Sequence, residues 1–265
     1  MRFGTAPLTT GIRVHYAEHG DASGSPILFL HGWPDSWFTF SRVLPLLPET
    51  LRAVAVDQRG FGNSDHPESG YTFQELAADA VALLDALDIG RAAIVGHSYG
   101  SFVAREVAIA APQRVTSLVL IGTGYSTDTP MTEGLQAALR TLPDPIPESF
   151  AREFQASTAY RALPAEFFDE IVSESLKIPA PLWPVMIDRL VQYEATAGLG
   201  KLLVPTLLLW GDHDALFSRA EQDRLLAAVP SASLKVYEET GHCPNWERPG
   251  DVAADIASFV LRQGT

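Results

Sequence analysis

Short apolar runs alternate with longer segments of helical periodicity through the first half of the chain. The runs contain no alternating polar residues, which is typical of strands buried on both faces of a parallel sheet. They occupy residues 27–30 (ILFL), 53–56 (AVAV), 92–95 (AAIV) and 117–121 (SLVLI). Residues 73–87 and 101–111, which lie between these runs, have the apolar spacing of helices with one buried face. This order predicts an α/β fold with a mostly parallel central sheet covered by helices.

The same pattern returns near the C-terminus. Residues 205–210 (PTLLLW) and 233–237 (SLKVY) are expected to form strands, and residues 219–228 and 252–261 are expected to form helices. An early segment, residues 14–18, is expected to pair at the edge of the sheet.

The segment from residue 126 to residue 200 has a different composition. It is rich in proline and in large aromatic side chains, and its apolar spacing is helical. We interpret it as several short helices inserted before the strand predicted at 205–210, which is followed by two aspartates. These helices are expected to form a lid (cap domain) over the carboxyl end of the sheet. The alternative is extra core packing away from any site. Residues 1–125 and 201–265 are expected to form the core domain.

Composition limits the classes of function. The chain has 265 residues, 46% of them hydrophobic and 19% charged, and its formal net charge is −13. We therefore expect neither a nucleic-acid partner nor an anionic membrane surface. A single cysteine cannot form an intramolecular disulfide, and no apolar run has the length of a signal peptide or a membrane span. A cytoplasmic protein is expected, and the sequence predicts no particular oligomeric state.

A Gly-His-Ser-Tyr-Gly motif occupies residues 96–100, directly after a predicted strand and before a predicted helix. This is the context of the G-x-S-x-G nucleophile elbow, in which the glycines permit a tight strand-to-helix turn. The turn raises the serine above the sheet at the positive end of a helix, where negative charge is stabilised. Ser98 is therefore the predicted nucleophile.

A serine hydroxyl needs an adjacent base to act as a nucleophile at neutral pH. His242 lies in a loop just after the strand predicted at 233–237, and we predict that it is this general base. Two aspartates follow the strand predicted at 205–210. Asp212 is expected to tie the turn, whereas Asp214 is expected to accept the Nδ1–H of His242 and to stabilise the imidazolium.

The segment HGWPDSW, residues 31–37, directly follows the first apolar run. A tetrahedral intermediate carries an oxyanion, which needs N–H donors placed in advance. We predict that the backbone N–H groups of Trp33 and Tyr99 are these donors, and that His31 holds the loop through hydrogen bonds. The same structural role is expected of His97 and His213. No metal-binding spacing of histidines occurs, so neither a metal nor another cofactor is expected.

A glycine-containing loop, DQRGFGNS at residues 57–64, follows the second apolar run. Asp57 and Arg59 are expected to brace this loop by pairing with each other. The loop has neither of the glycine spacings that bind phosphate, so a nucleotide site is not indicated.

Five segments together resemble the α/β-hydrolase superfamily: HGWPDSW, DQRGFGNS, GHSYG, GDHD and GHCPNWERP, in this order and spacing. The likeness covers nearly the whole chain. Within the superfamily, the chain resembles the small bacterial group described as serine esterases or cofactor-free haloperoxidases. It implies a catalytic triad of Ser98, Asp214 and His242, with an oxyanion hole at Trp33 and Tyr99. The HGWPDSW segment is also similar to epoxide hydrolases and haloalkane dehalogenases. Those enzymes have an aspartate nucleophile at the elbow, where this chain has Ser98.

These features favour hydrolysis of a carboxylic ester of a mainly apolar small molecule through an acyl-enzyme on Ser98. The expected pocket residues are Trp37, Phe150, Phe154 and Trp183. One alternative is carbon–carbon bond hydrolysis, or perhydrolase and haloperoxidase chemistry, by the same triad. The oxyanion segment of carbon–carbon bond hydrolases is usually richer in glycine than HGWPDSW. A non-catalytic small-molecule receptor on the same fold is an alternative of another class.

Overall fold

The apolar runs form the centre of an eight-stranded sheet in the computed structural model, which describes residues 1–127 and 129–263. Residue 128, inside the predicted lid, and residues 264–265, at the end of the predicted core, lie outside the described residues. Along the sheet the strands follow the order β1-β2-β4-β3-β5-β6-β7-β8. Their bounds are β1 Arg2–Pro7, β2 Arg13–His19, β3 Ser25–Leu30, β4 Leu51–Val56, β5 Ala92–His97, β6 Val115–Ile121, β7 Thr206–Gly211 and β8 Ala232–Tyr237.

Strands β3 to β8 are mutually parallel, and the α/β fold class predicted from the sequence is confirmed. Strand β2 is antiparallel to both β1 and β4, so the edge of the sheet is β1 and not the segment 14–18. Strand β1 was not predicted, because most of its side chains are exposed and form no apolar run. Gly4 of β1 lies under the ring of Tyr16, where a Cβ atom would approach the ring to 2.5 Å.

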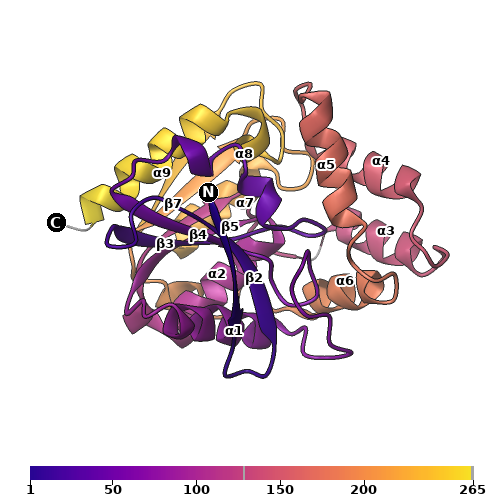
Figure 1. Ribbon diagram of the computed structural model, residues 1–265. Coiled ribbons are helices and arrows are strands. Elements are labelled where there is room, and N and C mark those ends of the chain that lie inside the picture. The colour runs from indigo at the N-terminus through magenta and orange to yellow at the C-terminus, as the bar shows by residue number, and fades with distance from the viewer. Residues whose placement is uncertain (128, 264–265) are drawn as a thin grey trace.

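Helices cover both faces of the sheet (Figure 1). Helices α1 (Phe73–Ala86) and α2 (Tyr99–Ala110) pack together on one face, and α9 (Pro249–Gln263) lies on the other. Helix α1 begins at a capping box, in which Thr72 Oγ1 accepts from the Glu75 N–H and the Glu75 carboxylate accepts from the Thr72 N–H. The remaining segments outside the insertion are η1 Trp37–Phe40, η2 Leu44–Leu46, η3 Pro112–Arg114, α7 Arg219–Ala228 and α8 Pro244–Glu247.

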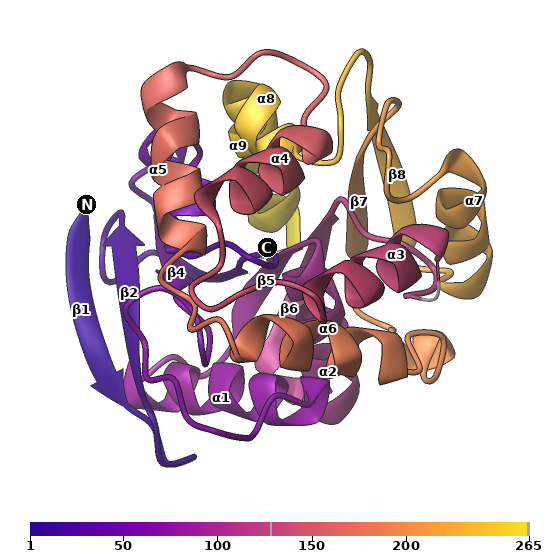
Figure 2. The ribbon, with the colours of Figure 1, turned by 90° about the vertical axis from the view of Figure 1, so that its right-hand side faces the viewer.

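Four helices lie between β6 and β7 in the described part of the chain. They are α3 (Pro130–Leu139), α4 (Glu148–Thr158), α5 (Ala165–Ser175) and α6 (Leu182–Gln192), followed by the short η4 (Leu199–Lys201). Figures 1 and 2 show these helices gathered on one side of the molecule, next to the sheet. We refer to them below as the inserted helices.

The strand register places the functional loops at one edge of the sheet. Leu30, the last residue of β3, is opposite Gly96 of β5, so the loop after β3 begins beside the nucleophile motif. Gly211 and Tyr237, the last residues of β7 and β8, are opposite each other. Because the strands are parallel, the loops that follow all four strands meet at the carboxyl edge, where α/β sheets bind ligands.

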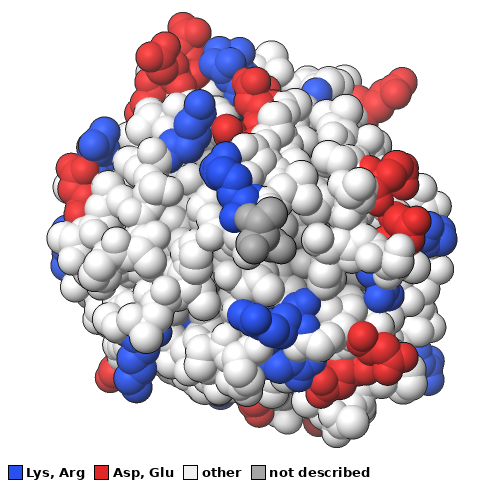
Figure 3. Space-filling view, turned by 90° about the vertical axis from the view of Figure 1, so that its left-hand side faces the viewer, with Lys and Arg blue, Asp and Glu red and all other residues white. Residues whose placement is uncertain are grey.

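Charged side chains of both signs are interspersed on the face shown in Figure 3. The negative net charge is therefore not gathered into one acidic patch on that face. No helix among residues 1–127 and 129–263 has the length and apolarity needed to cross a membrane.

The predicted pairing of Asp57 with Arg59 is wrong. The carboxylate of Asp57 is fully buried and accepts hydrogen bonds from the backbone N–H groups of Trp37 and Asn63, at 2.8 and 2.9 Å, and contacts His15 Nδ1 at 2.9 Å. Arg59 turns instead toward α1, where its guanidinium makes two 2.7 Å hydrogen bonds to Asp79. The two residues are separated only by Gln58, yet their side chains bond to different elements.

The Arg59–Asp79 pair gives a stability prediction. Replacing Asp79 with alanine leaves a buried guanidinium without its counter-ion, and we expect the free energy of unfolding to fall by about 3–5 kcal/mol. The matched control is Asp85→Ala on the same helix, because the Asp85 side chain is 58% exposed and pairs with Arg114 at the surface. That change should cost less than about 1 kcal/mol. Urea denaturation of both variants checks this, and similar losses in the two would contradict it.

Candidate active site

Ser98 stands at the junction of β5 and α2, in a backbone conformation that only a tightly held turn sustains. Its φ and ψ are 50° and −119°, outside the regions that a non-glycine residue normally occupies. The Ser98 N–H donates to the Ile121 carbonyl at 2.9 Å, which fixes the turn against β6. A Cβ atom on Gly100 would lie 2.2 Å from the Leu30 carbonyl oxygen, and one on Gly96 would lie 2.4 Å from the Gly100 carbonyl oxygen. Both motif glycines are therefore required by close backbone approach.

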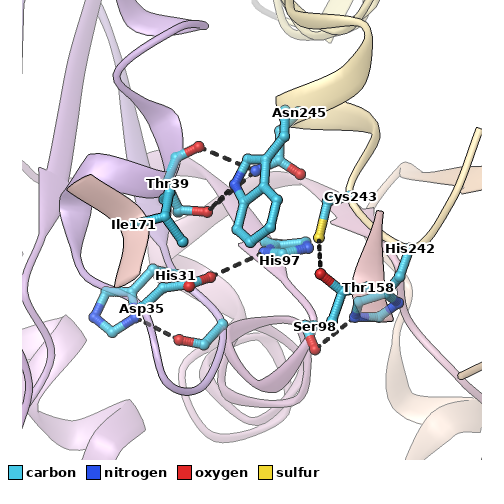
Figure 4. Close-up of polar contacts among 12 residues, drawn as sticks. His31, Asp35, Thr39, His97, Ser98, Thr158, Ile171, His242, Cys243 and Asn245 are labelled. Atoms are coloured by element: carbon cyan, nitrogen blue, oxygen red, sulfur yellow. Dashed lines mark hydrogen bonds and ion pairs between the residues drawn. The ribbon is translucent and has the colours of Figure 1, made fainter. Parts of the chain in front are cut away.

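His242 meets Ser98 from the loop after β8. Its Nε2 atom lies 2.8 Å from Ser98 Oγ, as Figure 4 shows. Its Nδ1 atom lies 3.0 Å from Asp214 Oδ2 and 3.2 Å from Oδ1. With Nδ1–H donating to the carboxylate, Nε2 is the atom that accepts the serine proton. The three predicted triad residues are thus joined in one chain of hydrogen bonds.

The carboxylate of Asp214 is fully buried and its position is fixed by the backbone. Its Oδ1 atom accepts from the N–H groups of Leu216 and Phe217, at 2.8 and 3.0 Å. Asp212 does not reach His242. It accepts from the Thr240 N–H at 3.3 Å and contacts His213 Nδ1 at 2.7 Å, so it ties the loops after β7 and β8 to each other.

The loop after β3 packs directly against the nucleophile. A Cβ atom on Gly32 would lie 3.1 Å from Ser98 Cβ, so the next residue, Trp33, follows a point of close contact. The Trp33 N–H makes no hydrogen bond to any described residue. The Tyr99 N–H is the first of helix α2 and has no acceptor within that helix. Neither predicted backbone donor is thus bonded to another described residue.

His31 holds the loop after β3 through hydrogen bonds, as predicted. Its Nδ1–H donates to the Gly32 carbonyl at 2.7 Å, and its Nε2 accepts from the Gln58 N–H at 3.0 Å. Burial lowers the pKa of His31 to about 4, so the ring is neutral at physiological pH. His97 is also buried, and burial holds its pKa well below the usual value for histidine. Its Nδ1 atom faces Asp35 Oδ2 at 3.8 Å (Figure 4).

Two of the four predicted pocket residues pack on the side chain of Trp33, and a third, Phe150, packs on one of these two. The ring centroids of Phe154 and Trp183 lie 5.0 and 5.1 Å from that of Trp33, both edge-on, and Phe150 lies 6.2 Å from Trp183. The fourth, Trp37, is not brought to this group. Its ring contacts Phe3 of β1 and Phe38 instead, with centroids 5.1 and 5.7 Å away.

Sequence reasoning missed two residues near the triad. Phe217 lies with its ring centroid 5.7 Å from that of His242 and also packs where Gly124 leaves space. Gln155, on α4, donates to Asp35. Neither residue lies in a motif, and the contact that places each one is made across distant parts of the chain. No group of three His, Cys, Asp or Glu side chains that could hold a metal ion is found among the described residues.

Comparison with known proteins agrees with this geometry. Residues 25–249 match the family model described as alpha/beta hydrolase fold. The chain belongs to the α/β-hydrolase family. It is 30% identical over 285 residues to a non-heme chloroperoxidase from Streptomyces lividans, covering 97% of this chain and 99% of that protein. It is 29% identical over 268 residues to a 2-hydroxymuconate semialdehyde hydrolase from a Pseudomonas species, covering 96% of this chain and 92% of that protein.

The solved structures show the same fold for this α/β hydrolase. A thermophilic esterase from Thermogutta terrifontis superposes with a TM-score of 0.85 at 24% identity, and the match covers all of both chains. A bromoperoxidase from Bacillus anthracis superposes with a TM-score of 0.86 at 20% identity, covering 98% of this chain. The resemblance to the α/β-hydrolase superfamily inferred from the motifs is confirmed by the family model and by the similarity to the non-heme chloroperoxidase.

The two aspartates after β7 give a direct test of the hydrogen-bond chain. We expect Asp214→Ala to slow the covalent labelling of Ser98 by a fluorophosphonate by about 10³–10⁴-fold, because His242 loses the group that sets its tautomer and stabilises its cation. Asp212→Ala, two residues away, should change the rate by only a few fold. Second-order labelling rates, with a thermal melt of each variant, provide the measurement. Equal rates for the two variants would show that Asp214 has no such role.

Proposed function

We propose that this α/β hydrolase cleaves carboxylic esters of mainly apolar small molecules through an acyl-enzyme on Ser98. The observation that carries the proposal is the 2.8 Å contact between the Ser98 hydroxyl and His242, whose opposite ring nitrogen is held by a buried carboxylate. This is the arrangement that activates a serine hydroxyl for attack on a carbonyl carbon.

In the proposed reaction, Ser98 Oγ attacks the ester carbonyl while its proton passes to His242 Nε2. The oxyanion is stabilised by the N–H groups of Trp33 and Tyr99, and loss of one such donor typically costs about 10²–10³-fold in rate. The imidazolium then gives its proton to the departing alcohol. Water, deprotonated by the same nitrogen, attacks the acyl-enzyme and releases the acid.

The nucleophile also selects among the chemistries found in this fold. An aspartate nucleophile can take part in alkyl displacement because the resulting alkyl ester is cleaved by water at its carbonyl carbon. Alkylation of Ser98 would produce an ether, which a histidine-activated water does not hydrolyse. Acyl transfer is therefore the reaction that the residues at this site complete.

The inserted helices are proposed to form the lid over this site. Phe154 and Trp183, which come from α4 and α6, contact the side chain of Trp33, whose backbone N–H is a proposed oxyanion donor. Both are aromatic, so the wall they form next to the reacting carbonyl favours carbon-rich substituents over charged ones. A small apolar ester in the cytoplasm is the proposed substrate class.

Carbon–carbon bond hydrolysis is the second candidate. It is favoured by one finding, the similarity along most of the chain to a 2-hydroxymuconate semialdehyde hydrolase. The same hydrogen-bond chain would serve it, because that reaction also ends in acyl transfer to water. Perhydrolysis is the corresponding proposal from the non-heme chloroperoxidase. Substrate profiling separates these reactions.

A screen of p-nitrophenyl and alkyl esters of graded acyl length tests the main proposal. We expect multiple turnovers by the wild type and a loss of at least about 10³-fold in Ser98→Ala, which keeps the fold but lacks the nucleophile. The screen is run beside vinylogous diketones and a peroxide-dependent halogenation assay. Ester rates at background across all lengths, with turnover in either of the other two assays, would replace the proposal by one of the alternatives. Stoichiometric fluorophosphonate labelling without turnover of any substrate would favour a receptor.

A further inference from the structure

Helix α4 contacts both loops that flank the nucleophile. The Gln155 side-chain amide donates to Asp35 Oδ1 at 2.8 Å, in the loop after β3. One turn later, the carbonyl of Thr158 accepts the backbone N–H of His242 at 2.9 Å. One inserted helix thus holds the loop of one proposed oxyanion donor, Trp33, and the loop of the proposed base.

Asp35 is well placed to fix the Trp33 amide. Its backbone N–H donates to the Gly32 carbonyl at 3.0 Å, closing a turn around Trp33 and Pro34. A Cβ atom on Gly32 would lie 3.3 Å from Asp35 Oδ2, so the carboxylate packs against the peptide that precedes Trp33. A shift of Asp35 would therefore move the N–H group that lies beside Ser98.

The Gln155 side chain is buried and held by two hydrogen bonds. Gln155 is 1% exposed, and its amide nitrogen donates both to Asp35 and to Ser175 Oγ, the latter at 2.9 Å. Burial raises the pKa of Asp35 to about 7, and the Gln155 hydrogen bond opposes that rise by stabilising the carboxylate. If position 155 served packing alone, an apolar side chain would suffice, because a buried polar group needs hydrogen-bond partners to offset its lost hydration. The amide of Gln155 therefore serves its hydrogen bonds.

The loop that carries His242 is held by Thr158, the last residue of the same helix. A Cβ atom on Gly241 would lie 2.8 Å from the Thr158 carbonyl oxygen, so that loop packs closely on the end of α4. The Cys243 thiol donates to Thr158 Oγ1 at 3.4 Å (Figure 4), next to the His242 backbone contact. Glu247 also holds the His242 loop, because its carboxylate accepts hydrogen bonds from the backbone N–H groups of Gly241 and Arg161, at 2.9 and 2.8 Å.

We propose that Gln155 and Thr158 are positioning residues. They hold the loop of Trp33 and the loop of His242 at their working distances from Ser98, so the site is complete only while α4 packs against both loops. This inference rests on the proposed function, because it assigns a role in assembling the same site. It gives the inserted helices a part in catalysis beyond enclosing the substrate.

The test uses a donor–acceptor exchange at Gln155 and Asp35. Gln155→Glu places two carboxylates face to face and should lower kcat and the fluorophosphonate labelling rate of Ser98 by about 100-fold, with KM changed less than threefold. Adding Asp35→Asn restores the hydrogen bond with its direction reversed, and at least tenfold of the loss should return. Gln155→Leu should show the loss without any such rescue. The matched control is Gln136→Leu, which removes a 2.6 Å hydrogen bond between α3 and Asp188 of α6 and should leave both rates within twofold of wild type.

Assays run below the melting temperature of each variant, measured by circular dichroism, separate positioning from unfolding. Gln155→Glu and Gln155→Leu that are folded and retain wild-type kcat would overturn the inference. A folded double variant with no recovery in kcat would overturn it as well. A wild type that neither reacts with the fluorophosphonate nor turns over esters would instead refute the proposed function, so the two failures are distinguishable.

Discussion

The close approach of the nucleophile turn to the end of β3 is the constraint on which the rest of the site depends. At Gly100 a Cβ atom would meet the carbonyl oxygens of both Leu30 and His31, at 2.2 and 2.4 Å. The absence of that atom lets the start of α2 lie against the backbone that leads to Trp33. The Ser98 backbone pays a conformational cost of about 1–3 kcal/mol for this turn. Hydrogen bonds from Ser98 N–H to Ile121 and from Ser101 N–H to the Ser98 carbonyl hold it there.

Parallel strands then bring the other groups to the same place. Because β3 and β5 are neighbours, the loop that contains Trp33 and the turn that contains Ser98 leave the sheet side by side. Strands β7 and β8 bring Asp214 and His242 to the same edge in the same way. Only β6 separates the two pairs, and His242 reaches across its end. Gly122, just after β6, has a φ of 52° and lies where a Cβ atom would approach the His242 carbonyl oxygen to 2.4 Å. A side chain there would push the base away from Ser98.

The parts of this arrangement that depend on short-range patterns were predictable from the sequence. The parallel strands, the nucleophile motif and the choice of Asp214 over Asp212 follow from apolar runs and from the distance of each residue beyond its strand. The errors share another origin. Asp57 and Arg59 are two residues apart in a loop and were expected to pair, but each bonds to an element that the chain reaches much earlier or later. Trp37 packs on β1, whose exposed side chains gave no signal. Gln155 and Asp35 are 120 residues apart, and no local pattern connects them.

The loop after β3 is held from two sides by contacts of different kinds. From the core side, His31 and Gln58 join it to the loop after β4 through hydrogen bonds among buried, uncharged groups. Neither contact involves the inserted helices. From the other side, Gln155 reaches Asp35 from a helix outside the sheet. Donors to an oxyanion lower the barrier only if they need no reorganisation when charge develops. The core contacts fix the position of the loop. The α4 contact joins the buried Asp35 carboxylate to a donor outside the sheet, so movement of the inserted helices would reach the reacting atoms through this contact.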